Sequence, residues 1–100
     1  MQPTVYILTN MKRGTLYIGV KADPALRILQ HHRGEGSAFV RRYQLHRLVH
    51  TESYYRIVEA IGREKQLKAW RRAWKIELIE AHNPGWTDLW PKGYPDGQGA

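Results

Sequence analysis

Glu64 has the position that points most directly to chemistry. It lies in a strongly helical stretch from about residue 54 to residue 81. At about 100° per residue, its side chain falls within the stripe expected to face the core. That stripe is formed by Ile57, Ala60, Ile61 and Leu67. An uncompensated carboxylate there is costly. Its compensation is an arginine, a metal ion or a water-filled cleft. The plain alternatives are a structural ion pair or an inward stripe of slightly different register.

Two further pairs of side chains have suitable chemistry. Arg27 and His31 are four residues apart on a predicted helix, and therefore share one face. Such a pair is usually solvated, but arginine also binds phosphate or a developing oxyanion, and histidine titrates near neutral pH. Tyr6 and Tyr17 lie in two strand-like stretches, VYIL and LYIGV. By propensity alone they form a cross-strand pair that stabilises a hairpin by about 0.2–1 kcal/mol.

The surrounding elements must position these residues. Strands are predicted at 5–9 and 15–20, joined by a turn at 10–14, with a third strand at 46–53. Asp23 and Pro24 begin a helix that stops at Gly34, and a short helix is predicted at 39–44. The long helix breaks near 70–72, and NPGW at 83–86 ends it. Trp70 and Trp74 have helical spacing with Leu67 and Leu78, which favours core packing.

This order predicts an α/β fold of the α+β type, with a small three-stranded, mainly antiparallel sheet and helices packed around it. One hundred residues allow a single domain, expected over 1–90. Residues 91–100 are rich in Gly and Pro and are predicted to be a disordered tail.

Composition narrows the partners. Sixteen Lys and Arg face nine Asp and Glu, a net charge of +7, which favours nucleic acid. The pair Arg41 and Arg42 and the run at 71–75 are either solvated faces or phosphate contacts. The chain has no cysteine, which excludes disulfides, a thiolate zinc site and a Cys nucleophile. We expect a cytoplasmic protein without a signal peptide or membrane span, because no apolar run approaches the roughly 20 residues required.

The stretches LYIGV, RILQH, AIGREKQLKAW and NPGWTDL, in this order and spacing, resemble the GIY-YIG nuclease family. The likeness covers nearly the whole chain. It is strongest to the small stand-alone bacterial branch, which is related to the catalytic domain of the bacterial excision-repair nuclease. One departure is that Val5-Tyr6-Ile7 stands where the family has Gly-Ile-Tyr: the tyrosine is kept and the glycine is not.

The resemblance implies hydrolysis of a DNA phosphodiester with a single divalent cation, Mg²⁺ or Mn²⁺. Glu64 would bind this cation, as suits a hard metal that keeps several waters. Arg27 would stabilise the charge of the transition state. Tyr6 or Tyr17 would orient and deprotonate the attacking water with help from His31, or His31 would shuttle the proton instead. The sequence leaves this choice open.

Other residues are expected to contact substrate. By the same resemblance, Gly19 would let the strand and the substrate backbone approach closely, and Asn83 would match a family asparagine near the site. Arg41 and Arg42 are the candidate phosphate contacts.

The chain would thus be a DNA endonuclease acting on branched, nicked or damaged DNA in repair or recombination. The alternatives are a non-catalytic nucleic-acid-binding module and a structural adaptor domain. The sequence indicates neither a protein partner nor a homodimer.

Overall fold

The computed structural model describes residues 2–22 and 38–89. Six elements follow along the chain: β1 (Thr4–Thr9), β2 (Leu16–Lys21), α2 (Ala38–Tyr43), β3 (Arg47–Ser53), α3 (Ile57–Ala69) and α4 (Arg72–His82). They confirm the three predicted strands, the short helix, and the break and end of the long helix. The predicted helix after Pro24 and the predicted tail at 91–100 lie outside the described residues. No helix in the described ranges is long and apolar enough to cross a membrane.

The sheet has the strand order β2-β1-β3, and both pairings are antiparallel. The central strand β1 is buried along its whole length, which explains its nearly continuous apolar sequence VYIL. The α+β class and the small antiparallel sheet are therefore confirmed.

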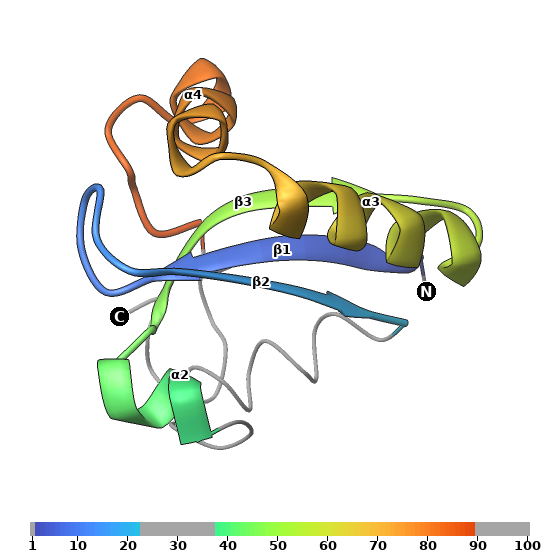
Figure 1. Ribbon diagram of the computed structural model, residues 1–100, viewed down its shortest axis with the longest axis horizontal. Helices are drawn as coiled ribbons and strands as arrows, with labels where there is room; N and C mark the ends of the chain where they lie inside the picture. Colours follow the sequence, from blue (N-terminus) through green and yellow to red (C-terminus); the bar gives the residue numbers. More distant parts are fainter. Residues whose placement is uncertain (1, 23–37, 90–100) are drawn as a thin grey trace.

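The register divides the side chains between two faces. Tyr6 lies opposite Gly19 and Leu8 lies opposite Tyr17, whereas Ile7 lies opposite Ile18 on the other face. Helices α3 and α4 cover one face of the sheet and α2 lies on the other (Figure 1). The tyrosines are therefore on the α2 face.

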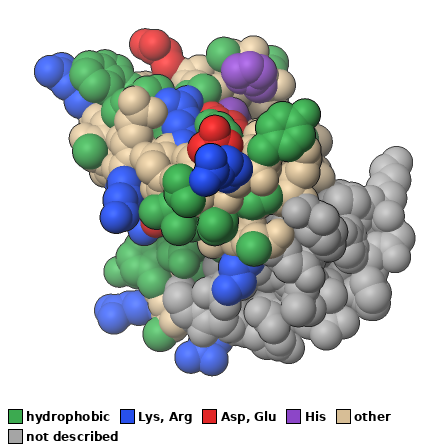
Figure 2. Space-filling model, turned by 90° about the vertical axis from the view of Figure 1, so that its right-hand side faces the viewer, with side chains coloured by type: hydrophobic (Ala, Val, Ile, Leu, Met, Phe, Trp, Pro, Cys, Tyr) green, Lys and Arg blue, Asp and Glu red, His purple; other side chains and the backbone are tan. Residues whose placement is uncertain are grey.

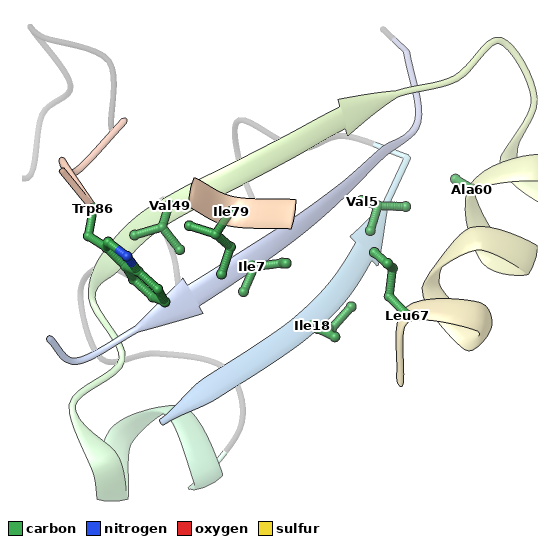
Figure 3. Packing of buried hydrophobic residues seen from close by; sticks show 8 residues of the cluster. All are labelled: Val5, Ile7, Ile18, Val49, Ala60, Leu67, Ile79 and Trp86. Carbon is green, nitrogen blue, oxygen red and sulfur yellow. The ribbon is translucent and has the colours of Figure 1, made fainter. Parts of the chain in front are cut away.

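A separate apolar cluster fills each face. The cluster under α3 and α4 (Figure 3) consists of Val5, Ile7, Ile18, Val49, Ala60, Leu67, Ile79 and Trp86. The cluster on the α2 face consists of Tyr6, Leu8, Val40, Leu45 and Leu48, with Tyr17 packed against it. Both faces of a three-stranded sheet are thus covered, although α2 has only six residues.

The inward stripe of α3 differs from the prediction. Ala60 and Leu67 are buried, but Ile57 and Ile61 are 38% and 37% exposed. The helix packs against β1 and β2, and this narrow sheet surface buries only a narrow stripe of the helix. Glu64 lies between Ala60 and Leu67 at spacings of four and three residues, so it still belongs to the inward side.

The tryptophans also depart from the prediction. Trp70 packs partly against the core, but Trp74 is 46% exposed, so its assignment to the core was wrong. The tryptophan that fills the core is Trp86, which is fully buried and donates from Nε1 to Glu80 Oε2 at 2.8 Å. Helical spacing favoured Trp74 as a core residue. It gave no signal for residue 86, which follows the end of α4 and has no periodic pattern.

Candidate active site

The two tyrosines lie side by side on the α2 face, with ring centroids 6.4 Å apart and ring planes tilted by 34°. Tyr6 is only 1% exposed and belongs to the apolar cluster. Tyr17 is half-buried, and its ring centroid is 6.2 Å from that of Phe39 on α2. The pair therefore presents one ring inside the core and one at its margin.

Gly19 makes the position of the Tyr6 ring possible. A Cβ atom at residue 19 would lie 2.6 Å from both Cζ and Oη of Tyr6. The two residues are direct partners in the β1–β2 register, and the ring of Tyr6 lies over the bare backbone of Gly19. In the structure Gly19 thus allows a close approach of Tyr6, and its expected approach to a substrate stays a prediction.

A groove of about 270 Å³ runs beside β2. It is lined by Leu16, Tyr17 and Ile18 of β2, Phe39 of α2, Lys68 of α3 and Lys75 of α4. Since β2 is an edge strand, side chains from both faces of the sheet can meet there. Lys75 Nζ donates to the carbonyl oxygen of Lys68 at 3.5 Å, so the two lysines are neighbours on the α3–α4 side of the groove.

Glu64 is connected to this groove through Lys68. Its side chain is 13% exposed and its carboxylate forms an ion pair with Lys68 Nζ, one helical turn along α3. The pair supplies the compensation that a carboxylate on an inward face requires. Tyr17 lines the groove from one face of the sheet, and Lys68, which holds Glu64, lines it from the other. The four-residue spacing was a signal for Lys68 that sequence reasoning missed.

A second carboxylate, Glu52 on β3, anchors α3 and helps to orient the helix about its own axis. Arg63 binds it with both sides of its guanidinium, Nε to Oε1 at 2.8 Å and Nη2 to Oε2 at 3.2 Å. Tyr54 Oη also donates to Oε1 at 2.8 Å, and His50 Nε2 lies 2.8 Å from Oε2. Because Arg63 directly precedes Glu64, anchoring Arg63 to β3 helps to set where Glu64 points.

The pKa of Glu52 reflects these contacts. Burial alone would raise it, but the hydrogen bonds from Arg63, His50 and Tyr54 outweigh burial and lower the pKa to about 2. Glu52 is therefore ionised throughout the physiological range. Sequence reasoning missed it because an alternating strand gives no sign of which polar residue meets a helix.

Asn83 lies at the opposite edge of the sheet. Its Nδ2 donates to the carbonyl oxygens of Val49 (3.2 Å) and Thr87 (2.8 Å), and its Oδ1 accepts from Thr87 N at 3.0 Å. The same segment continues along β3, where Leu48 N donates to Asp88 Oδ1 and Leu89 N donates to Leu48 O. The NPGWTDL stretch therefore latches the chain after α4 onto β3, and the structure does not bring Asn83 to the β2 groove.

The remaining predicted residues divide into two groups. Arg41 and Arg42 are exposed in the last turn of α2, with the Arg42 guanidinium 5.7 Å from the ring centroid of Tyr43. Arg27 and His31 lie outside the described residues. Among the residues that are described, no group of three or more His, Asp or Glu side chains could hold a metal ion by itself.

Comparison with protein families gives a match over most of the chain. The model of the GIY-YIG catalytic domain matches residues 2–77, which include β1, β2 and α3 with Tyr6, Tyr17 and Glu64. The chain belongs to the GIY-YIG family. Since this is a family of nuclease domains, DNA is the substrate that the family implies.

The curated relatives of this GIY-YIG domain are small proteins. The UPF0213 protein SERP0126 of Staphylococcus epidermidis is 32% identical over 76 residues, 76% of this chain and 92% of the relative. The UPF0213 protein SA0446 of Staphylococcus aureus is 34% identical over the same shares. No solved structure gives a significant match.

Proposed function

We propose that this GIY-YIG domain is a divalent-metal-dependent DNA endonuclease whose reaction centre lies in the β2 groove. The observation that carries the proposal is that Tyr17 lines the same groove as Lys68, the ion-pair partner of Glu64. A phenol and an ammonium group from two faces of the sheet thus line one cavity, and the ammonium group is paired with the carboxylate of Glu64. The family and the net charge of +7 support DNA as the substrate.

The groove favours Tyr17 over Tyr6 as the residue that orients the attacking water. Tyr17 lines the cavity, whereas Tyr6 is 1% exposed beneath it. A group that takes a proton from water must come within hydrogen-bond reach of that water. Tyr6 then acts as a positioning residue, because its ring packs beside that of Tyr17 and is held by Gly19.

The residues present fit a hard divalent cation. Glu64 offers a carboxylate one ion pair away from the groove, and its pairing with Lys68 indicates that a positive charge is accommodated there. Mg²⁺ is commonly held by one or two carboxylates together with waters and phosphate oxygens. When bound, such an ion would polarise the scissile phosphate and stabilise the leaving oxygen. The water would give up a proton toward Tyr17 as its oxygen forms the new bond to phosphorus; the bond to the 3′ oxygen would break, and that oxygen would take up a proton.

Cleavage assays test this function. Labelled blunt duplex, nicked, flap and junction DNAs are incubated with the protein and Mg²⁺ or Mn²⁺. We expect metal-dependent cutting of at least one substrate. Glu64→Gln should lower the rate by at least 100-fold, because the amide removes the charge that holds the metal while keeping the shape.

A matched control keeps the comparison fair. Glu59→Gln alters an exposed carboxylate in the first turn of the same helix, where glutamine can still complete the cap, and should cut like the wild type. If the wild type cuts no substrate faster than Glu64→Gln, the proposed endonuclease activity is refuted. Salt-sensitive DNA binding without cleavage would then identify a non-catalytic binding module.

A further inference from the structure

The aromatic groove on α4 is not used by the proposed reaction. It has a volume of about 420 Å³ and is lined by Trp70, Trp74, Glu77, Leu78 and Ala81. Trp74 is 46% exposed, and its ring meets that of Trp70 edge-on with centroids 6.1 Å apart. Much of the apolar surface of this indole is therefore left in contact with water, where burying it would be favourable.

Cations flank both indoles. The guanidinium of Arg71 lies 5.0 Å from the ring centroid of Trp74, and that of Arg63 lies 5.0 Å from the ring centroid of Trp70. Aromatic rings bordered by arginine are how proteins bind unpaired nucleic acid strands, because every base has a stacking face and every nucleotide carries a phosphate. Figure 2 shows one face of the molecule, on which Lys and Arg side chains lie among hydrophobic ones.

Glu77 is the acidic residue that lines the α4 groove. Its charge favours a base over a phosphate as the group that the groove binds. A carboxylate repels phosphate but accepts a hydrogen bond from the exocyclic amine of cytosine. The groove thus offers an aromatic wall, apolar carbon atoms from Leu78 and Ala81, and one acceptor. These groups match the face and the edge of a base.

The groove also adjoins the proposed reaction centre. Trp74 and Lys75 are consecutive residues in the first turn of α4, and Lys75 lines the β2 groove. A DNA strand that passes Tyr17 and Lys75 could therefore continue to Trp74. Bases in an intact duplex are paired and stacked on one another, so only an unpaired base could enter.

We propose that the α4 groove binds an unpaired nucleobase of the DNA substrate, by stacking on Trp74 and by a hydrogen bond from an exocyclic amine to Glu77. The proposal rests on the proposed function for its choice of DNA as the ligand. It gives the domain a physical means of preferring DNA with a single-stranded segment over blunt duplex.

Equilibrium binding in EDTA tests this without any cleavage. Fluorescence anisotropy is measured with one duplex in three forms: blunt, with a short oligo-dC tail, and with an abasic tail of equal length. The wild type should bind the dC tail about 5- to 100-fold more tightly than the abasic tail. Trp74→Ala should lose this preference while its blunt-duplex affinity stays within about twofold. Trp74→Phe should keep most of it.

Matched controls separate the contributions. Tyr55→Ala removes an aromatic ring that is 89% exposed and lines none of these grooves, and should bind all three DNAs like the wild type. An oligo-dT tail, which lacks an exocyclic amine, should bind several-fold more weakly than oligo-dC, and Glu77→Ala should abolish that difference. Equal binding of dT and dC by the wild type would refute the role of Glu77.

The proposal is overturned if the wild type binds base-bearing and abasic tails equally, or if Trp74→Ala weakens blunt and tailed duplexes by the same factor. Either result leaves the proposed endonuclease intact, because that depends on metal-dependent cleavage and on Glu64. The converse result is also informative. If the protein cleaves no DNA and still shows the Trp74-dependent preference, the binding site is supported and the proposed endonuclease activity is refuted.

Discussion

Replacing Gly19 with alanine tests whether this glycine serves Tyr6 or the substrate. The new Cβ would lie 2.6 Å from Cζ and from the hydroxyl oxygen of Tyr6, where ordinary contact begins at 3.4 Å. The ring must therefore retreat by about 0.8 Å, but it is 1% exposed and packed in an apolar cluster. Overpacking of this kind costs about 1–3 kcal/mol.

The expected result is a loss of stability together with activity. For a domain of this size, 1 kcal/mol corresponds to a shift in Tm of roughly 4–8 °C, so Gly19→Ala should lower Tm by about 5–20 °C. The rate of DNA cleavage should fall as well, because the displaced ring of Tyr6 pushes on that of Tyr17. Thermal unfolding followed by circular dichroism measures the first effect, and single-turnover cleavage below Tm measures the second.

A double mutant identifies the cause. Tyr6→Leu removes the ring that the Cβ meets, so adding Gly19→Ala to Tyr6→Leu should cost much less stability than adding it to the wild type. If Gly19→Ala abolishes cleavage without changing Tm, and costs the same in both backgrounds, the glycine faces the substrate and our reading of its contact with Tyr6 is wrong.

Three further predictions concern charged side chains and the latch, which is the segment 83–89 that is hydrogen-bonded to β3. Glu52→Gln should lower the unfolding free energy at pH 7 by about 2–3 kcal/mol, as the depressed pKa of this carboxyl implies. Because that pKa is about 2 when folded and near 4.5 when unfolded, the stabilisation is present above pH 4.5 and is lost as the pH falls toward 2; urea titrations should show the gap to the variant narrowing over that window. Lys68→Met should raise the affinity for Mn²⁺ several-fold in paramagnetic resonance titrations, because the ammonium competes for the carboxylate of Glu64, whereas Lys75→Met, which removes an equal charge from the same groove, should change it less. Equal effects would mean that only the net charge of the groove matters. Asn83→Ala should cost about 1–3 kcal/mol in chemical denaturation, because it leaves buried backbone groups without partners, and should leave the Mn²⁺ affinity unchanged.

The sequence predicts the elements of this fold well because they are local. The tyrosines fall on strands and Glu64 on the inward side of a helix, as periodicity indicates. Periodicity could not show which face of the sheet each helix covers. It therefore could not show that Tyr17 and Lys68, the partner of Glu64, line one groove at the edge strand β2. That meeting depends on strand order and on the packing of α3, which are non-local.

Errors in the sequence interpretation have the same origin. Ile57 and Ile61 look like core residues on a helical wheel, but the sheet beneath α3 is too narrow to cover them. Asn83 was expected near the site from a resemblance in its motif, and that role stays a prediction; in the structure its polar atoms are hydrogen-bonded to the backbone of β3 and of its own loop. A motif can mark a family through residues that stabilise the fold as well as through those that react.

The latch at residues 83–89 has a consequence for how the protein behaves at high concentration. The outer edge of a sheet carries unpaired backbone groups that can pair with another molecule and start aggregation. Here the N–H and C=O of Leu48, on the first half of β3, are occupied by Asp88 and by Leu89 N. A chain shortened to end before residue 83 would expose this edge of β3 and would also leave the core position of Trp86 empty. We therefore expect such a truncated chain to self-associate through β3. The segment after α4 would thus protect the protein from aggregation.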